Sequence, residues 1–506
     1  MSSSAVTTDA TPQSSTGFVK AMSLTDATML VAGSMIGSGI FIVSASMARG
    51  LPSPMWLMLA WLLSGIMTLL GALAYGEMAA MYPQAGGQYV FLRESMGNLI
   101  GFLYGWTFFV VIQTGTIAAV AVAFGKFMGV LVPGITPGFY PWFPRADVCV
   151  AALGCTDPAN AITLGLNPQR LVGLLSIAVL TWINLRGVRE GKFVQTSLTV
   201  VKTGALALLI ILGLTLGRNA TALTANFSAG RFVGDWSLSY TLVVAFGAAM
   251  VGSLFSSDAW NSVTFAAAEV KNPSRNLPLA LVLGTGLVSL LYIVANVSYL
   301  NVLPYDGVTT GADVVSRGVR FATQDRVGTA VAETIFGASG GALMAVAILI
   351  STFGCNNGLI LSGARVLYAM SRDGVFFRRA GTLNHNHVPA FALIVQSVWT
   401  AFLCLTGTYN QLLNYVIFAA LLFYVATTLG LFILRRTRAG APRPYRALGY
   451  PVLPALYILL AAGVAVLLLL APTTRTESVS GLVLVLVGIP VFYLWRRAER
   501  PAIAAA

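Results

Sequence analysis

Residues 34–41 read SMIGSGIF and lie inside an apolar run that extends from residue 24 to residue 48. A run of this length is typical of a membrane-spanning helix, which needs ~20 mostly apolar residues. The three consecutive residues Gly37, Ser38 and Gly39 are poor formers of an uninterrupted helix. A backbone group left unpaired in hydrocarbon costs several kcal/mol, so a break here must face protein or a cavity. We therefore expect the first membrane helix to unwind at this triplet.

The composition of the whole chain predicts a membrane protein. Of its 506 residues, 57% are apolar and only 9% are charged, whereas an average globular protein carries ~25% charged residues. A soluble fold of this length could not cover its surface with so few charges. Hydropathy predicts an all-α polytopic membrane protein with twelve transmembrane helices. We expect these helices at residues 24–48, 55–81, 97–132, 168–185, 194–216, 237–268, 276–302, 330–370, 389–407, 410–434, 450–471 and 477–496.

The net charge of +13 orients the chain in the membrane. A basic protein can bind nucleic acid, but the placement of the 30 Lys and Arg residues offers another explanation. With the N-terminus inside, eighteen of them fall in inner segments, nine in outer segments and three inside helices. This bias is typical of the positive-inside rule and predicts two cytoplasmic termini without any nucleic acid. The expected location is the plasma membrane, which is the inner membrane in a bacterium.

The four cysteines form two groups. Cys355 and Cys404 fall within predicted helices and are expected to be plain apolar side chains. Cys149 and Cys155 fall in the long outer loop, whose oxidising surroundings permit a disulfide. The sequence leaves open whether these two are bonded to each other or are free thiols.

A second break is predicted in the sixth helix, five helices after the first. Its middle reads FSSD, residues 255–258. Serine and aspartate are poor inside a helix but good at a fresh helix start. A pair of interrupted helices at corresponding positions of two halves is the best sequence indication of a secondary transporter's binding site. Close helix packing through small residues is the alternative explanation.

Two broken helices also predict the class of ligand. The free amide groups at the start of an outer half-helix favour an anionic group by ~0.3–2 kcal/mol. The free carbonyl groups at the end of an inner half-helix favour an ammonium group. An α-amino acid carries both charges on neighbouring atoms, so the zwitterion satisfies both broken ends at once.

Four motifs of the chain resemble those of one transporter family. They are GSMIGSGIF in the first helix, YGEMAAMYPQAGGQYVFL after the second, FSSDAWNSVTFAAAEVKNPSRNLP across the sixth and GARVLYAMSRDG in the eighth. Together they resemble the amino acid–polyamine–organocation (APC) superfamily, closest to the L-type amino acid transporter branch and its bacterial relatives. The resemblance implies a LeuT-type fold, with helices 1–5 and 6–10 as inverted repeats and helices 1 and 6 unwound. Residues 24–434 would form this core, residues 450–496 two peripheral helices, and residues 1–23 and 497–506 cytoplasmic tails, the first of them disordered.

The resemblance also implies which residues hold the amino acid. The amides of Gly37, Ser38 and Gly39 would bind the substrate carboxylate. The carbonyls near Ile36 and Phe255 would bind the substrate amine. The ring of Phe255 would close over the substrate from the outer side as a lid.

The residues after this phenylalanine shape the expected pocket. Ser256 and Ser257 stand where relatives often carry a larger side chain, so the shape of the pocket is left open. Asp258 is expected to cap the outer half of its own broken helix or to bind polar neighbours, with direct substrate contact as a weaker alternative.

Lys202 lies within the predicted fifth helix, and ionisable residues inside membrane helices are functional candidates. Snorkelling to the interface is one explanation. The resemblance implies another, because a lysine here replaces a bound sodium ion in sodium-independent relatives and ties helix 5 to helices 1 and 8. The expected partners are carbonyls near Gly33 and the hydroxyls of Ser351 and Thr352. A fixed strut and a proton carrier both remain open.

Glu77 and Arg365 lie near the inner ends of the second and eighth helices. They are expected either to form part of an inner gate or to make an ion pair that only stabilises the fold. No metal or cofactor is expected, because His385 and His387 are the only histidines and no phosphate-binding loop appears. No cluster of nucleophile, base and metal predicts an enzyme.

The expected function is sodium-independent secondary transport of amino acids, chiefly neutral L-amino acids, by exchange with alternating access. The alternative is proton-coupled symport with Lys202 titrating. Eukaryotic members of the branch pair with a heavy-chain glycoprotein through a cysteine in the loop after helix 3. The spacing of Cys149 and Cys155 suggests a bond between these two instead, so no heavy chain is expected. The expected partners are an amino acid and the lipid bilayer, and the oligomeric state is left open.

Overall fold

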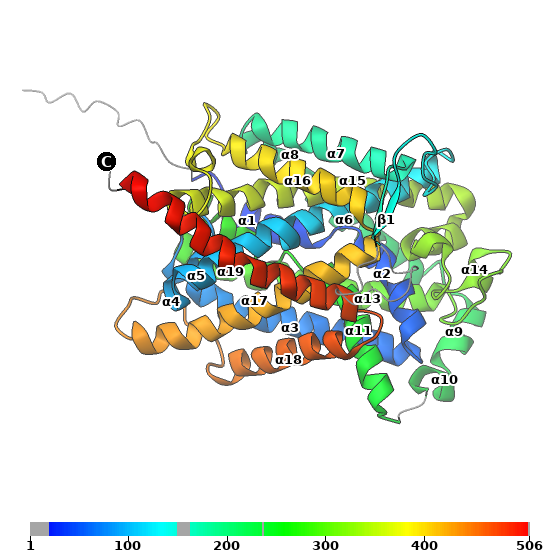
Figure 1. The fold of residues 1–506 in the computed structure, drawn as a ribbon. Coiled ribbons are helices and arrows are strands. Elements are labelled where there is room, and N and C mark those ends of the chain that lie inside the picture. The colour runs from blue at the N-terminus through cyan, green and yellow to red at the C-terminus, as the bar shows by residue number, and fades with distance from the viewer. Residues whose placement is uncertain (1–19, 149–161, 235–236, 504–506) are drawn as a thin grey trace, which may run out of the picture.

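A computed structural model describes residues 20–148, 162–234 and 237–503 as a bundle of long helices that lie side by side (Figure 1). The long helical segments are α1 (Leu24–Met35), α2 (Gly39–Gly50), α3 (Pro54–Met81), α5 (Asn98–Thr107), the π-helix η1 (Phe108–Ile112), α6 (Gln113–Leu131), α7 (Pro168–Leu185), α8 (Val188–Leu214), α11 (Tyr240–Ser256), α12 (Ser262–Phe265), α13 (Pro273–Val302), α15 (Val327–Arg372), α16 (Ala390–Thr406), α17 (Tyr409–Thr437), α18 (Val452–Leu470) and α19 (Arg475–Ile503). The smaller elements are α4 (Gln88–Met96), the antiparallel strands β1 (Ala146–Val148) and β2 (Ile162–Leu164), α9 (Ala220–Phe227), α10 (Ala229–Val233), η4 (Ala267–Glu269), α14 (Val314–Arg317), η5 (Thr323–Asp325) and η6 (Arg378–Gly381). Cys149 and Cys155, whose pairing the sequence leaves open, lie outside the described residues.

Ten helices in the described part of the chain are long and apolar enough to cross a membrane. Two further apolar helices, α11 and α16, have only 17 residues each. At 1.5 Å per residue they reach about 25 Å, somewhat less than the ~30 Å hydrocarbon core of a bilayer. The prediction of an all-α polytopic membrane protein is confirmed, and the count of twelve spans stays a prediction.

Most predicted helix ends agree with the structure to within a few residues, and the largest difference is at the end of the last helix. α19 continues to Ile503, seven residues past the predicted end at residue 496, and residues 497–500, which read RAER, are good helix formers. At the other terminus, Met22 forms a parallel bridge with Val270. Its amide donates to the carbonyl of Glu269 at 2.9 Å. Residues 20–23, the last four of the expected tail, therefore pack against the segment that follows the sixth helix.

The outer surface of the bundle is apolar and its interior contains polar groups. Large aliphatic side chains point outward from four different helices, with exposed fractions of 58% for Leu175, 58% for Ile211, 72% for Leu343 and 70% for Leu459. Buried polar side chains lie between the helices. This distribution reverses that of a soluble protein and is the one a bilayer requires, because lipid offers polar groups no partners.

The first helix lies in the middle of the bundle. α1 packs against α8, α13 and α15, and α2 packs against α11. We call the end of the bundle that holds α4 and the last turns of α19 the inner end. The opposite end, with β1, α9, α10 and α14, is the outer end (Figure 1). A break in this central helix is therefore enclosed by other helices on its sides.

Candidate functional site

The first helix unwinds where the sequence predicts. α1 ends at Met35 and α2 begins at Gly39. The amide of Gly37 turns back and donates to the carbonyl of Met35 at 2.8 Å, so it is not one of the donors that open α2. Within the described part of the chain, the amides of Ser38 and Gly39 have no hydrogen-bond acceptor. Two of the three expected donors are therefore available to an anionic group.

Side chains from three other helices satisfy the carbonyls that this break releases. Five consecutive carbonyl groups, residues 33–37, each accept a hydrogen bond from a side chain. The donors are the Nζ of Lys202 to Gly33, the Sγ of Cys355 to Ser34 at 3.0 Å, the hydroxyl of Tyr292 to Met35 at 2.9 Å, and the Oγ of Ser351 to Ile36 at 3.1 Å and to Gly37 at 3.2 Å. A carbonyl oxygen has two lone pairs, so the expected amine contact at Ile36 remains open.

The sixth helix also unwinds, between Ser256 at the end of α11 and Ser262 at the start of α12. Ala259 in this gap has a φ angle of +61°. Residues with a Cβ seldom adopt that left-handed conformation, and such strain gathers at functional sites. The two predicted breaks are thus confirmed, one in each half of the chain.

Asp258 does not cap an outer half-helix, contrary to one expectation. The sixth helix runs from the outer to the inner end, so the half that starts after the break is the inner one, α12. The N-cap residue of α12 is Asn261, three positions further on. The buried carboxylate of Asp258 instead accepts a hydrogen bond from the hydroxyl of Tyr424 on α17. The alternative of a polar neighbour is the correct one.

The two breaks meet at one small cavity. A Cβ added to Gly39 would lie 2.9 Å from the Cα of Ser256, so the two backbones are nearly in contact. Both unwound segments line this cavity together with Thr116 and Val120 of α6 and Cys355 of α15. Its volume is about 10 Å³, which is room for about one water molecule. An amino acid can bind here only when the site widens.

Tyr409, the first residue of α17, contacts both breaks. Its hydroxyl lies 3.1 Å from the Oγ of Ser38 in the first break. Its ring meets the ring of Phe255 edge to face, with centroids 6.0 Å apart. The expected lid at Phe255 is therefore one half of an aromatic pair that joins both breaks to α17.

Lys202 is buried, with 1% of its surface exposed, and reaches the inner half of the first helix. Its ammonium donates to the carbonyl of Gly33 and lies 3.5 Å from the carbonyl of Ser351. The expected carbonyl partner is confirmed, but the expected hydroxyl partners are wrong. The hydroxyl of Ser351 faces the break, and that of Thr352 donates to Ile348 in its own helix at 2.9 Å. The lysine thus ties α8 to α1 and α15 through main-chain groups.

Glu77 and Arg365 do not pair with each other. The buried carboxylate of Glu77 binds Arg435 at 2.5 Å and Arg443 at 3.2 Å. Arg435 lies in the last turn of α17, and Arg443 lies in the segment that follows this helix. Arg365 binds Glu269 at 2.8 Å, and both of these side chains are fully buried. Glu77 and Arg365 therefore each have another partner, and they do not form an ion pair with each other in this conformation.

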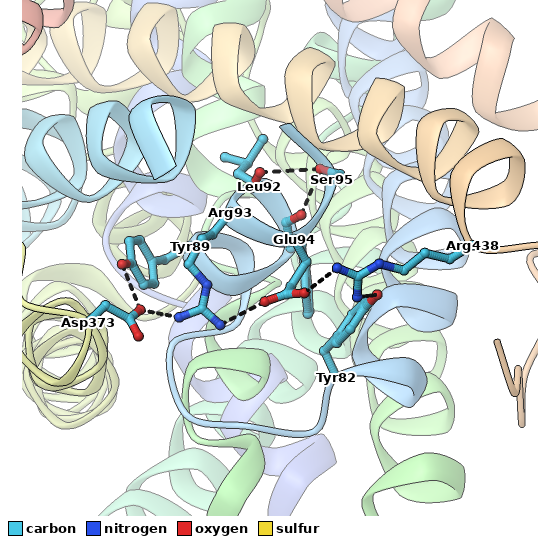
Figure 2. Close-up of polar contacts among 9 residues, drawn as sticks. Tyr82, Tyr89, Leu92, Arg93, Glu94, Ser95, Asp373 and Arg438 are labelled. Atoms are coloured by element: carbon cyan, nitrogen blue, oxygen red, sulfur yellow. Dashed lines mark hydrogen bonds and ion pairs between the residues drawn. The ribbon is translucent and has the colours of Figure 1, made fainter. Parts of the chain in front are cut away.

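A chain of ion pairs anchors α4 at the inner end (Figure 2). Arg93 bridges Asp373, just after α15, and Glu94 at 2.9 Å. Glu94 also binds Arg438, just after α17, at 2.8 Å. Tyr89 adds a hydrogen bond of 2.8 Å to Asp373. Partial burial raises the pKa of the Glu94 carboxyl, but the hydrogen bonds from both arginines outweigh burial and leave that pKa below its ordinary value.

Comparison with known proteins shows the family of this chain. The sequence model of a family described as amino acid permease matches residues 22–492. The chain belongs to the amino acid permease family. This permease is 30% identical over 485 residues to the serine/threonine exchanger SteT of Bacillus subtilis (strain 168), covering 94% of this chain and 97% of that protein. It is 29% identical over 470 residues to b(0,+)-type amino acid transporter 1 of Rattus norvegicus, covering 92% and 85%. It is 28% identical over 502 residues to large neutral amino acids transporter small subunit 2 of Homo sapiens, covering 96% and 83%.

The predicted superfamily is therefore correct. The permease is a multi-pass membrane transporter of amino acids and not an enzyme. Its two unwound helices and the cavity between them lie at the residues where the sequence analysis expects the substrate.

Sequence reasoning missed three residues of the site. Tyr409 and Tyr424 are two of 17 tyrosines, and both reach the breaks from α17, far along the chain. Cys355, expected to be a plain apolar side chain, lines the cavity and donates to Ser34. A capping box, in which Thr408 and Gln411 bond each other's backbone, fixes the start of α17 beside the site. This capping-box pattern at residues 408–411 was the feature of the sequence that could have predicted where α17 begins.

Proposed function

We propose that this permease exchanges amino acids across the plasma membrane without sodium, by alternating access, and that neutral L-amino acids are its main substrates. One observation carries the proposal. The two helix breaks lie against each other, with free amides at Ser38 and Gly39 on one side and main-chain carbonyls on the other. This arrangement matches the two charges of a zwitterion.

In the proposed complex, the carboxylate of the substrate accepts hydrogen bonds from the amides of Ser38 and Gly39. The amine donates to the carbonyls of Ile36 and Phe255. Replacing Ser38 with proline removes one amide donor and is expected to abolish binding. Ser38→Ala is the matched control, because it keeps the amide and loses only the hydroxyl that faces Tyr409. Equal transport by Ser38→Pro and Ser38→Ala would contradict the carboxylate assignment.

Two features support neutral substrates. The single acidic side chain at the breaks, Asp258, already accepts a hydrogen bond from Tyr424, so it offers less to a second cation. Apart from Asp258, the side chains that line the cavity, such as Phe255 and Thr116, are apolar or carry only a hydroxyl or thiol group. The similar protein SteT is named as a serine/threonine exchanger, and both of these amino acids have uncharged side chains. Competition by a panel of unlabelled amino acids tests this preference directly.

Lys202 supports independence from sodium. Its buried ammonium already fills the space beside the carbonyls of Gly33 and Ser351, where oxygen ligands would otherwise suit a small cation. We expect uptake to be unchanged when sodium is replaced by N-methyl-D-glucamine. A loss of tenfold or more in that buffer would contradict the assignment.

Purified protein in liposomes distinguishes exchange from its alternative. Under exchange, uptake of labelled amino acid requires unlabelled amino acid inside the vesicles. Under proton symport, in which Lys202 would titrate, a pH gradient alone drives uptake into empty vesicles. Uptake into empty vesicles driven by a pH gradient would show that the mechanism is symport and not exchange, and the proposed class of substrate would be unaffected.

The charge distribution supports an orientation with the inner end of the bundle in the cytoplasm. This places α4, the last turns of α19 and both termini on the cytoplasmic side. We propose that the permease works without a heavy-chain glycoprotein. Transport by the purified single chain in liposomes is the test of that independence.

A further inference from the structure

The motif PQAGGQYVFL, which the proposed substrate contacts do not use, forms a tight turn against the inner half of the sixth helix. Gly86 and Gly87 have φ angles of +110° and +45°. The amide of Gly86 donates to the carbonyl of Phe265 at 3.1 Å. A Cβ on Gly87 would lie 2.7 Å from the carbonyl carbon of Thr264. Only glycine permits both the conformation and this close approach of two backbones.

This turn presents Gln88, the first residue of α4, to the interior of the bundle. The side chain is buried, with 1% of its surface exposed. Its Oε1 accepts a hydrogen bond from the Nδ2 of Asn261 at 2.8 Å, and its Nε2 donates to the Oγ1 of Thr427 at 3.0 Å. Asn261 belongs to the unwound segment of the sixth helix, and Thr427 belongs to α17. One amide group therefore connects α4, the sixth helix and α17.

Gln88 also lines a second cavity, on the inner side of the substrate site. Its lining includes Asp258, Asn261, Ser262 and Phe265. Thr116, Asp258 and Ala259 line both this cavity and the site cavity, so the two cavities adjoin. The volume of the second cavity is about 10 Å³, too small for an amino acid. A substrate that leaves the site toward the inner end on this side must displace the hydrogen-bonded Gln88.

We propose that Gln88 is the inner gate of the transport path, held shut by its two hydrogen bonds to Asn261 and Thr427. This proposal rests on the proposed function, since a gate requires a transported substrate. Opening consists of the loss of both bonds together with withdrawal of the N-terminal end of α4. Asn261 belongs to the unwound segment beside the substrate site, so rearrangement of that segment also breaks one of the two bonds.

The ion pairs of Figure 2 support the gate from behind. Arg93 and Glu94 lie five and six residues after Gln88 on the same short helix and tie it to Asp373 and Arg438. Those partners follow α15 and α17 directly. When the ends of α15 and α17 move relative to each other, these ion pairs therefore pull on α4, which moves as one rigid helix. The gate residue sits at the end of α4 that points into the bundle.

The test measures access to the inner cavity without any substrate. Ser262→Cys places a thiol in the lining of that cavity, and its rate of reaction with a small water-soluble thiol reagent reports opening. The parent protein, with its four native cysteines, gives the background. Gln88→Met keeps the volume of the side chain and removes both hydrogen bonds. Gln88→Ala removes the volume as well. We expect both to raise the labelling rate of the introduced thiol by roughly 5- to 160-fold, the range that two lost hydrogen bonds allow.

Gln396→Ala is the matched control. Gln396 is equally buried and donates to a carbonyl of α15, but it lies on α16 outside both cavities. We expect this variant to leave the labelling rate at the level of Ser262→Cys alone. An unchanged rate in both Gln88 variants, or an equal rise in Gln396→Ala, would overturn the gate. Failure of the parent to transport amino acids would instead overturn the proposed function, because labelling needs no substrate.

Discussion

Gly39 shows how a single residue lets two broken helices share one site. Its missing side chain leaves the backbone of α2 almost touching Ser256, and a Cβ there would lie 2.9 Å from the Cα of that serine. We expect Gly39→Ala to separate the breaks and to abolish substrate binding. Gly463→Ala is the matched control, because a Cβ at that position on α18 meets nothing within 4 Å. Uptake at the parent level in Gly39→Ala would contradict direct contact of the two breaks.

Tyr409 offers a separate test at the scale of one atom. Tyr409→Phe removes the hydroxyl that faces Ser38 and keeps the ring against Phe255. A lost hydrogen bond costs about 0.5–1.5 kcal/mol, so the KM for substrate should change by about 2- to 13-fold. Tyr409→Ala removes the ring as well and should reduce transport much further. Equal effects of the two variants would show that the ring has no part in closing the site.

Among single residues, the sequence predicted those that act through their backbone better than those that act through a distant side chain. Ser38 and Gly39 could be found because a break needs small residues at one place in one helix. Lys202 could be found because a charge within an apolar run is rare. Tyr409 and Tyr424 could not, because their contacts depend on how α17 packs against helices hundreds of residues away.

The docking of α4 shows how one short element depends on charge. The pKa of Glu94 lies below its ordinary value of 4.5, since Arg93 and Arg438 outweigh the effect of burial. A depressed pKa means that the carboxylate stabilises the fold above the unfolded value and loses this effect as pH falls through the folded value. We expect the melting temperature of the parent to exceed that of Glu94→Gln by a constant amount from pH 8 to about 5.5. The excess should shrink below about 4.5. An excess that instead shrinks between pH 8 and 6 would assign the effect to another group.

A buried ion pair holds the end of the sixth helix to α15. Arg365 and Glu269 are fully buried and 2.8 Å apart. Removing one partner leaves a charge in a low-dielectric interior, at a cost of about 3–5 kcal/mol. We expect Arg365→Met alone to lower the melting temperature strongly, and the double variant Arg365→Met with Glu269→Leu to recover much of the loss. A double variant less stable than the single one would contradict a simple charge-pair role.

At the level of elements, the positions of the helices and of both breaks followed from apolar runs interrupted by Gly, Ser and Asp. The cap expected at Asp258 was wrong. The chain runs through the sixth helix from the outer to the inner end, so the half-helix that starts after the break is the inner one, and Asn261 is its N-cap. For Glu77 and Arg365 the sequence left an inner gate and a stabilising ion pair open, and it did not identify the partner of either residue. Sequence spacing does not reveal that Arg435, Arg443 and Glu269 lie nearer.

For the whole molecule, the small volume of the site indicates a conformation that holds the two breaks tightly together. The cavity has room for about one water molecule. The adjoining inner cavity, which Gln88 lines, is equally small. Binding at the proposed site must therefore be coupled to a change in shape, as in the proposed alternating access. A ligand can shift that equilibrium only by its difference in affinity between the two shapes.

Substrate binding should consequently appear as a gain in stability of the whole protein. A ligand that binds only the folded state stabilises it by about 2.7 kcal/mol at 100 times its Kd. We expect substrate amino acids at millimolar concentration to raise the melting temperature of the purified protein by several degrees. Analogues that lack either the carboxylate or the amine should have no effect, because each leaves one broken helix end unsatisfied. Gly39→Ala should show a flat response to every amino acid, and a normal response there would place the binding site elsewhere in the bundle.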